Sequence, residues 1–336
     1  MAPTSFGVEY DDMSRTLDQI KAPVASELED FEAHFREALK SDVSLLDKIT
    51  YYIVRRKGKQ IRPIFVFLSA RMFGECKEPT FHAASLVEIL HTATLVHDDV
   101  VDDSQMRRGF FSINALWKNK IAVLVGDYLL SRGLLLALDN DQFILLKILS
   151  RAVRDMSEGE LLQLEKARRL DIAEDVYYNI IRQKTASLIA AACSAGSAST
   201  QLDPDLQQRM YTFGEKIGMA FQIKDDLLDF GEEATGKPKG IDVKEKKLTL
   251  PLIYSLAQAE AGQKRRILRM IKQNSEARAT FNAVYDLILE KGGLTYARQK
   301  MIAFRDEAFA ILHSFPDSPS RQSLEQLVYF VTDRKY

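Results

Sequence analysis

The sequence has few cysteines, few chain breakers and no excess of one charge. Its 336 residues include two cysteines, Cys76 and Cys193, which excludes a disulfide framework and a cysteine-rich zinc site. The 46 basic and 47 acidic side chains leave a net charge of −1. This balance argues against a nucleic-acid partner, which normally requires a strongly basic surface. The 16 glycines and 9 prolines are few for this length, and their scarcity favours long helices.

Long hydrophobic runs are also missing. The N-terminal stretch MAPTSFGVEYDDMSRTL is mixed and acidic, without the apolar segment of a signal peptide. The most apolar stretch, residues 121–138, contains Asp127 and Arg132, so we interpret it as a buried helix and not as a membrane span. Together with the low cysteine content, these absences lead us to expect a cytoplasmic protein.

Helical periodicity runs along most of the chain. Apolar residues recur at three- and four-residue steps, and no convincing period-two alternation occurs, so the predicted class is all-α. We predict helices near residues 24–40, 44–56, 63–73, 80–101, 113–137, 141–170, 172–195, 204–230, 249–260, 263–273, 276–291, 294–313 and 319–332. Polar loops are expected at 104–112 and 231–247. Residues 1–20 are expected to form a flexible segment and residues 21–336 one domain, because no low-complexity linker divides them.

Two acidic motifs of the form DDxxD each end an apolar helical run. The first is Asp98-Asp99-Val100-Val101-Asp102-Asp103 and the second is Asp225-Asp226-Leu227-Leu228-Asp229. Residues one turn apart share a helix face, so Asp98 and Asp102 point the same way. Crowded carboxylates repel one another, and a multivalent cation would remove that cost. The donors are all oxygens, which suits Mg²⁺. One such motif could be a solvated helix end, but two are hard to explain in that way.

Other polar residues lie near these motifs or at breaks between helices. His91 lies two turns before Asp98, and Gln222 lies one turn before the second motif. The basic residues at break points are Lys59, Arg62, Arg107, Arg108, Lys184 (followed by Thr185), Lys237, Lys239 and Lys247. Cations beside a metal cluster indicate a ligand more negative than the metals can neutralise, such as a diphosphate.

Small residues accompany the charged ones. Ala93 and Thr94 lie about a turn before Asp98, and a run of alanines, 190–192, follows Lys184 and Ala186. These residues could line an elongated apolar cavity or allow helices to pack closely, and the sequence leaves both possibilities open.

Together the motifs resemble the trans-isoprenyl diphosphate synthases, the polyprenyl synthetase family, from about residue 43 to the C-terminus. They are GKQIRP at 58–63, HTATLVHDDVVDDSQMRRG at 91–109, GDYLLSRG at 126–133, KTASL at 184–188, GMAFQIKDDLLDF at 218–230 and GKPKGIDVKEKKLTLPL at 236–252. The resemblance implies the isoprenoid synthase fold, an antiparallel helix bundle around a deep central cavity, as a homodimer. It also implies a reaction in which isopentenyl diphosphate elongates an allylic diphosphate head-to-tail, with three Mg²⁺ per active site.

The resemblance also assigns roles to individual positions. The principal Mg²⁺ ligands would be Asp98, Asp102 and Asp225, with Asp99, Asp226 and Asp229 supporting them or binding through water. Isopentenyl diphosphate would bind Lys59, Arg62, His91 and Arg108. The allylic diphosphate would bind Arg107, Lys184, Thr185, Gln222, Lys239 and Lys247. Arg107, Lys184 and Lys239 would act in catalysis by stabilising the leaving diphosphate, which is itself the base in this family.

The sequence departs from the family pattern in two loops. The usual GGKRLRP reads KGKQIRP, with Lys57 in place of Gly and Gln60 in place of a basic residue. The usual EGKxTLP reads EKKLTLP, with Lys246 in place of Gly. The family's loop lysine could be Lys237 or Lys239, and we prefer Lys239 because KGID ends the loop in the family's manner.

Ala93 and Thr94 bear on product length. Short-chain members typically place an aromatic residue at one of these positions, so we expect a product longer than the fifteen-carbon farnesyl chain, in the range of quinone side chains. Such a product is membrane-soluble, and we expect transient membrane contact during its release. The alternative within this chemistry is a short-chain farnesyl or geranylgeranyl diphosphate synthase.

Other functions are possible on the same fold. A terpene cyclase or a head-to-head synthase is disfavoured because a cyclase would not need Lys59, Arg62 and His91. A non-catalytic partner subunit should have lost one acidic motif, and both are intact. A metal- or lipid-binding module would not need the basic residues at the helix breaks.

Overall fold

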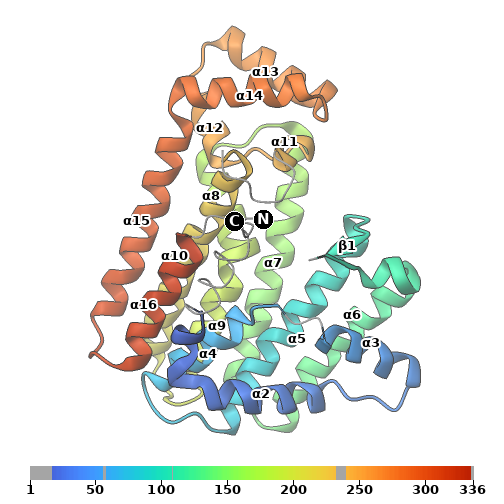
Figure 1. The fold of residues 1–336 in the computed structure, drawn as a ribbon, viewed down its shortest axis with the longest axis vertical. Helices are drawn as coiled ribbons and strands as arrows, with labels where there is room; N and C mark the ends of the chain where they lie inside the picture. Colours follow the sequence, from blue (N-terminus) through green and yellow to red (C-terminus); the bar gives the residue numbers. More distant parts are fainter. Residues whose placement is uncertain (1–16, 56–57, 108, 232–239, 334–336) are drawn as a thin grey trace, which may run out of the picture. The chain divides into compact units, whose positions relative to one another are not determined.

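The computed structural model describes residues 17–55, 58–107, 109–231 and 240–333, and this part of the chain is almost entirely helical (Figure 1). Its longer helices are α2 (Ala25–Ala38), α3 (Ser44–Arg55), α4 (Ile61–Arg71), α5 (Glu78–Val101), α6 (Ile113–Asp139), α7 (Phe143–Arg169), α8 (Glu174–Ile181), α9 (Ser187–Ala198), α10 (Pro204–Asp229), α12 (Leu250–Ala257), α13 (Ala261–Asn274), α14 (Arg278–Lys291), α15 (Gly293–His313) and α16 (Pro319–Thr332). The all-α prediction is confirmed.

The other elements of the described structure are short. A 3₁₀ turn, η1 (Ala22–Val24), precedes α2, and the single turn α11 (Ile241–Lys244) follows α10. The predicted loop at 104–112 contains two antiparallel two-residue strands, β1 (Met106–Arg107) and β2 (Phe110–Phe111). The predicted helix at 172–195 is divided into α8 and α9 by a π turn, η2 (Arg182–Ala186).

Contacts divide the chain into two compact units. Unit 1 comprises Met1–Val153, Ala191–Tyr211 and Pro316–Leu324, and unit 2 comprises the remainder. The single domain expected over residues 21–336 stays a prediction. Residues 1–16 of the expected flexible segment lie outside the described residues, whereas residues 17–20 are helical and Ile20 is fully buried.

Unit 1 is built on α2, α4, α5 and α6. Its core contains an aromatic cluster in which the rings of Phe31 and Phe67 meet edge to face, with Phe81 against Phe67. Helix α5 packs along α6 and also contacts α2 and α4 (Figure 1). Because its apolar residues are buried on several sides, α5 is a rigid support for the acidic motif at its C-terminal end.

Unit 2 has a separate apolar core. Side chains of α8 and of α10 to α15 form it, and helices α12, α14 and α15 contact one another. Gly218 on α10 lies directly against Ala186, where a side chain would collide with the alanine backbone. Here the structure favours close helix packing over a cavity as the role of these small residues.

Helix α6 is less buried than its sequence suggests. Among the described helices, it is the one long and apolar enough to span a membrane, but core helices of soluble proteins meet the same test. A third of its most apolar stretch is buried in the chain. The interpretation of residues 121–138 as a buried helix is therefore wrong for one face, where Leu124 and Leu135 are exposed.

Candidate active site

The first acidic motif lies at the C-terminal end of α5 in unit 1. Helix α5 ends at Val101, and the backbone N–H of Asp102 donates to the carbonyl oxygen of Asp98 at 2.8 Å, one turn away. This arrangement puts both aspartates on one side of the helix. The partial negative charge of a helix C-terminus disfavours carboxylates, so a bound cation would stabilise this end of α5.

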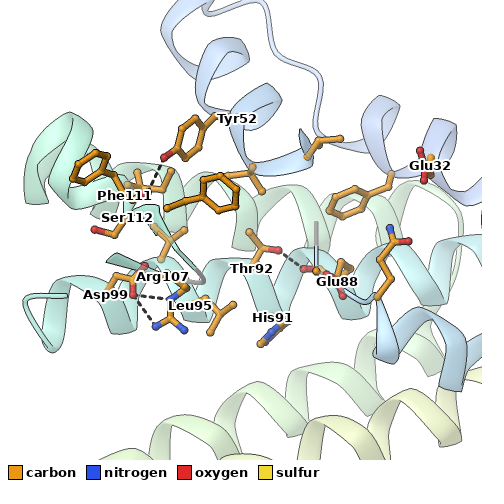
Figure 2. Close-up of a pocket in the computed structure, with 18 residues that line it drawn as sticks. Glu32, Tyr52, Glu88, His91, Thr92, Leu95, Asp99, Arg107, Phe111 and Ser112 are labelled. Atoms are coloured by element: carbon orange, nitrogen blue, oxygen red, sulfur yellow. Dashed lines mark hydrogen bonds and ion pairs between the residues drawn. The ribbon is translucent and has the colours of Figure 1, made fainter. Parts of the chain in front are cut away.

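Asp99 turns to a different partner. It is 3% exposed, and its Oδ1 accepts hydrogen bonds from Nε and Nη2 of Arg107, each at 2.7 Å (Figure 2). The side chain of Asn114 donates to the backbone oxygen of Asp99 at 3.2 Å. Arg107 lies on β1, so the hairpin brings the guanidinium to the acidic motif. The resemblance assigns Asp99 to Mg²⁺ and Arg107 to the allylic diphosphate, and the structure pairs the two residues with each other.

A cavity in unit 1, here called the unit-1 cavity, brings several predicted residues together. His91, Asp99 and Arg107 line it, together with Gly58 and Gln60 on either side of Lys59. His91 is buried, whereas Lys59 is exposed and Arg62 lies half-buried in the first turn of α4. Arg108 lies outside the described residues, as does Lys57.

The wall of the unit-1 cavity is otherwise apolar and aromatic. Tyr52 donates from its hydroxyl to the backbone oxygen of Phe111 at 2.7 Å, which joins α3 to the hairpin (Figure 2). Ala93 and Thr94 are not among the described residues that line this cavity. Ala93 is fully buried in α5, and the Thr94 hydroxyl donates to the carbonyl oxygen of His91 at 2.8 Å.

In unit 2, Lys184 and Thr185 lie in the π turn between α8 and α9. π turns are rare and occur frequently at functional sites. Gly159 on α7 lies against this turn, and a Cβ atom on it would lie 2.8 Å from both Cβ of Gln183 and the backbone N of Lys184. The absence of a side chain at Gly159 therefore allows α7 to approach the turn, and the ammonium of Lys184 contacts Glu160.

A chain of hydrogen bonds connects the π turn to the second acidic motif. The Thr185 hydroxyl donates to Oε1 of Gln222 at 2.8 Å, and Nε2 of Gln222 donates to Oδ1 of Asp226 at 2.9 Å. The hydroxyl of Tyr177 donates to the other oxygen, Oδ2, at 2.6 Å. Both oxygens of Asp226 are thereby fixed. Burial raises the pKa of this carboxyl well above the usual range, and the two hydrogen bonds act against that shift.

Asp229 connects the second motif to α11. Its two carboxylate oxygens accept the backbone N–H groups of Ile241, at 3.0 Å, and Asp242, at 3.2 Å. Burial raises the pKa of Asp229, and these backbone donors oppose the shift. Burial also raises the pKa of Asp242, to about 7, with the charge of Asp229 acting in the same direction. Asp225 is half-buried at the same end of α10.

A second cavity, here called the unit-2 cavity, brings together five of the predicted residues of this unit. Lys184, Thr185, Gln222, Asp226 and Lys247 all line it. Sequence reasoning missed three other residues of this site, Tyr177, Asp242 and Glu160. Tyr177 lies two helical turns before Lys184, and that spacing is the one signal that could have identified it.

The departure from the family pattern at Lys246 affects the local backbone. Lys246, where the family has Gly, has a φ of 60°, in the left-handed region that favours glycine. Its Nζ donates to the carbonyl oxygen of Lys272 at 3.3 Å, near the C-terminal end of α13. Lys237 and Lys239 lie outside the described residues, so the choice between them stays a prediction.

The donor set is chemically suited to Mg²⁺. Within the described ranges, no three His, Cys, Asp or Glu side chains are grouped as a ready-made metal site. Mg²⁺ does not require such a group, since it uses one or two carboxylates and completes its shell with water and phosphate oxygens. Asp98 and Asp102 are one turn apart on α5, and Asp225 and Asp226 adjoin on α10. These hard oxygen donors fit the ion.

Comparison with known proteins identifies the family. Residues 43–288 match the family model described as "Polyprenyl synthetase". The chain is 36% identical to the octaprenyl diphosphate synthase of Escherichia coli over 320 residues, covering 95% of this chain and 99% of that protein. The protein is therefore a member of the polyprenyl synthetase family, a family of prenyltransferases.

Solved structures agree with this assignment. A decaprenyl diphosphate synthase from Rhodobacter capsulatus is 36% identical, with a TM-score of 0.89 and coverage of 95% of this chain and 99% of that one. A polyprenyl synthase from Caulobacter crescentus, complexed with calcium and isoprenyl diphosphate, is 34% identical, with a TM-score of 0.86 and coverage of 95% and 98%. The isoprenoid synthase fold expected from the sequence is confirmed.

Proposed function

We propose that this protein condenses isopentenyl diphosphate head-to-tail with an allylic diphosphate to give a trans-polyprenyl diphosphate longer than farnesyl. The observation that carries the proposal is the similarity of this chain to the octaprenyl diphosphate synthase of Escherichia coli. That enzyme is named for an eight-unit product, and the similarity covers 99% of its length. The sites in the two units support it, since each combines acidic motif residues with basic side chains in one cavity.

The difficult step is breakage of the allylic C–O bond, which leaves a carbocation and a diphosphate. Lys184, Thr185 and Lys247 would bind the allylic diphosphate. The Gln222 amide, which is hydrogen-bonded to Thr185 and Asp226, would join them. Fixed cations that contact the leaving group more strongly as its charge develops lower the barrier without reorganisation. Arg107 and Lys239 are assigned to the same task.

The second substrate would be held by Lys59, Arg62, His91 and Arg108. A fixed diphosphate makes the attack of its double bond on the carbocation effectively intramolecular. The apolar wall of the unit-1 cavity would exclude water from a reactive cation. The departing diphosphate would then accept the proton, so no side chain is assigned as base.

Mg²⁺, three per active site, would be held by Asp98, Asp102 and Asp225, with Asp99, Asp226 and Asp229 in support. When bound, it would supply Lewis-acid stabilisation of the diphosphate oxygens. The hydrogen bonds of Tyr177 and Gln222 to Asp226, and of the α11 backbone to Asp229, fit a supporting role for these two carboxylates.

One assay tests the function. The purified chain alone is incubated with Mg²⁺, labelled isopentenyl diphosphate and a series of allylic diphosphates, and the products are separated by chromatography. We expect chains longer than fifteen carbons. A sole farnesyl product would contradict the proposed length, and no extension at all would favour a subunit that requires a partner.

Ala93 offers a separate test of product length. Because Ala93 has no exposed surface, the Ala93→Val and Ala93→Phe variants add graded bulk to this side of α5. We expect progressively shorter products with turnover retained, and unchanged length would show that Ala93 does not bear on the cavity. Thermal unfolding checks the fold, because overpacking a buried site typically costs about 1–3 kcal/mol.

We further propose that the protein is a cytoplasmic homodimer whose product leaves through transient membrane contact. The exposed apolar face of α6 supports a subunit interface. Leu124, Leu135 and Leu138 are each 45–56% exposed in the single chain and fall on one side of the helix.

A further inference from the structure

Glu160 and Lys184 form an ion pair beside the unit-2 cavity. Lys184 lines that cavity, and its ammonium contacts Oε2 of Glu160. The other carboxylate oxygen, Oε1, accepts a hydrogen bond from Nε2 of Gln163 at 3.5 Å. The two paired side chains are 33% and 24% exposed, so the pair is partly shielded from water. The lysine assigned to a diphosphate therefore already has an anion of its own chain bound to it.

The backbone holds this pair together. Gly159 immediately precedes Glu160, and its missing side chain lets α7 lie against the π turn that carries Lys184. Adding one Cβ atom at Gly159 would place it 2.8 Å from the backbone N of Lys184. The carboxylate of Glu160 consequently stays within reach of the lysine for as long as α7 and the π turn keep this approach.

The other lysine that lines the unit-2 cavity among the described residues is paired in the same manner. Nζ of Lys247 lies 2.5 Å from Oε2 of Glu245. Asp226, in contrast, accepts hydrogen bonds from Tyr177 and Gln222. The two lysines of the cavity are thus paired with Glu160 and Glu245, which lie outside the acidic motif.

We propose that Glu160 is a resident counter-anion that a diphosphate displaces from Lys184, and that it limits how tightly the site holds pyrophosphate. This inference rests on the proposed function, because it assumes that Lys184 binds a diphosphate group. A diphosphate has more charge and more acceptor oxygens than one carboxylate, so it can take the ammonium from Glu160. When pyrophosphate leaves, Glu160 binds the ammonium again.

This exchange suits an enzyme that makes long products. Each added unit releases one pyrophosphate, so slow release would limit every cycle of chain growth. A carboxylate that re-forms its ion pair with Lys184 offsets part of the electrostatic cost of removing the anion. Glu160 therefore acts through Lys184 as a positioning residue.

The test is calorimetric titration of inorganic pyrophosphate into the full-length protein, with and without Mg²⁺. Glu160→Gln removes the charge and keeps the shape of the side chain. We expect the Kd of pyrophosphate to fall about 1.4- to 5-fold, which corresponds to about 0.2–1 kcal/mol, the typical worth of a partly exposed ion pair. In steady-state assays the KM for the allylic diphosphate should fall, while kcat stays level or drops because product leaves more slowly.

The control is Glu165→Gln on the same helix. Glu165 pairs with Arg169 at 3.6 Å and does not line the unit-2 cavity, so its variant should leave the Kd unchanged. Glu160→Ala, which removes the whole carboxylate arm, should shift the Kd in the same direction as Glu160→Gln. Thermal unfolding verifies that each variant folds.

The Lys184→Gln variant distinguishes the assignment of Lys184 as a diphosphate ligand from the counter-anion role of Glu160. If it does not weaken pyrophosphate binding, both the assignment of Lys184 and the counter-anion proposal are overturned. If Lys184→Gln weakens binding while Glu160→Gln leaves the Kd unchanged or raises it, only the counter-anion proposal is overturned.

Discussion

Tyr177 shows how one hydroxyl can organise an acidic motif. It lies on α8, it is buried, and its oxygen is 2.6 Å from Oδ2 of Asp226. Burial and the nearby carboxylate raise the pKa of Tyr177 well above its usual value, so the phenol stays protonated and remains a donor. Loss of this donor would leave a buried carboxylate oxygen without its hydrogen bond.

We predict that Tyr177→Phe lowers the free energy of unfolding by about 1–3 kcal/mol, the typical cost of an unsatisfied buried polar group. It should also weaken activation by Mg²⁺ by about 10- to 100-fold, as is typical when a residue that orients a metal ligand is lost. Urea denaturation and a Mg²⁺ titration of activity measure these effects. In the control Tyr178→Phe, Glu174 keeps its hydrogen bond from Tyr296, so the change should be smaller.

Asp242 gives the metal-free protein a pH-dependent stability. Burial, reinforced by the charge of Asp229, raises its pKa from the ordinary value of 3.8 to about 7 in the folded chain. Between these values the folded state binds more protons than the unfolded state, so stability falls as pH rises. The unfolded carboxyl is already ionised above about pH 5, which places the loss between about pH 4 and 7.

We therefore predict that the free energy of unfolding of the metal-free protein decreases from about pH 4 to about pH 7, by up to about 1.4 kcal/mol per pH unit for this one group. Asp242→Asn should flatten the slope. Denaturant titrations at several pH values, in the presence of a chelator, measure it. A wild-type slope that the variant reproduces would show that Asp242 does not cause it.

At the scale of elements, the contact between α7 and the π turn depends on a glycine. We predict that Gly159→Ala forces α7 away from Gln183 and Lys184, because a Cβ atom there would lie 2.8 Å from each. The expected results are a loss of about 1–3 kcal/mol in stability, as for overpacking in general, and a higher KM for the allylic diphosphate. KM should rise because a shifted π turn misplaces Lys184 and Thr185, an effect that we expect to outweigh the release of Lys184 from Glu160.

Gly262→Ala is the matched control for Gly159→Ala. Gly262 lies in the first turn of α13, and a Cβ atom there would have no neighbour within 4 Å. That variant should be neutral or more stable by about 0.4–1 kcal/mol, because alanine restricts the unfolded chain. Equal effects of the two substitutions on KM would refute the role given to the α7 contact.

Helices with a regular apolar repeat could be predicted from the sequence closely. Helices α5 and α10 begin and end within about two residues of their predicted bounds, since apolar spacing reports which face is buried. The π turn within 172–195 could not be predicted as such, because it depends on contact with Gly159 on another helix. The same holds for the β1–β2 hairpin, whose position depends on Tyr52 and on the pairing of Arg107 with Asp99.

The residues of the candidate site also differ in whether a local sequence pattern reveals them. Asp98, Asp102 and Asp225 could be picked out because repeated carboxylates on an apolar helix are costly without a ligand. Tyr177 and Glu160 could not, since a single tyrosine in an apolar helix and a single glutamate in a charged one are common. Their roles depend on partners far away in the sequence, and those partners become visible only in the folded chain.

At the scale of the whole molecule, the net charge does not indicate a partner, whereas the exposed apolar surface does. A net charge of −1 spread over 93 charged residues gives no preferred charged partner. The exposed apolar residues of α6 are more informative, because contiguous apolar surface on a soluble protein usually marks an interface. With about 3.6 residues per turn, Leu124, Leu135 and Leu138 lie within about 60° of one another around the helix.

We predict that this face of α6 joins two copies of the chain. Leu124→Glu with Leu135→Glu would place two carboxylates in an apolar interface, where unpaired charges are strongly unfavourable, so light scattering after gel filtration should show a dimer in the wild type and a monomer in the variant. Leu289→Glu, at a leucine that is 53% exposed on α14, is the control and should leave the dimer intact. A wild-type monomer that binds lipid vesicles through α6 would instead assign this face to the membrane, and a variant that remains dimeric would place the interface elsewhere.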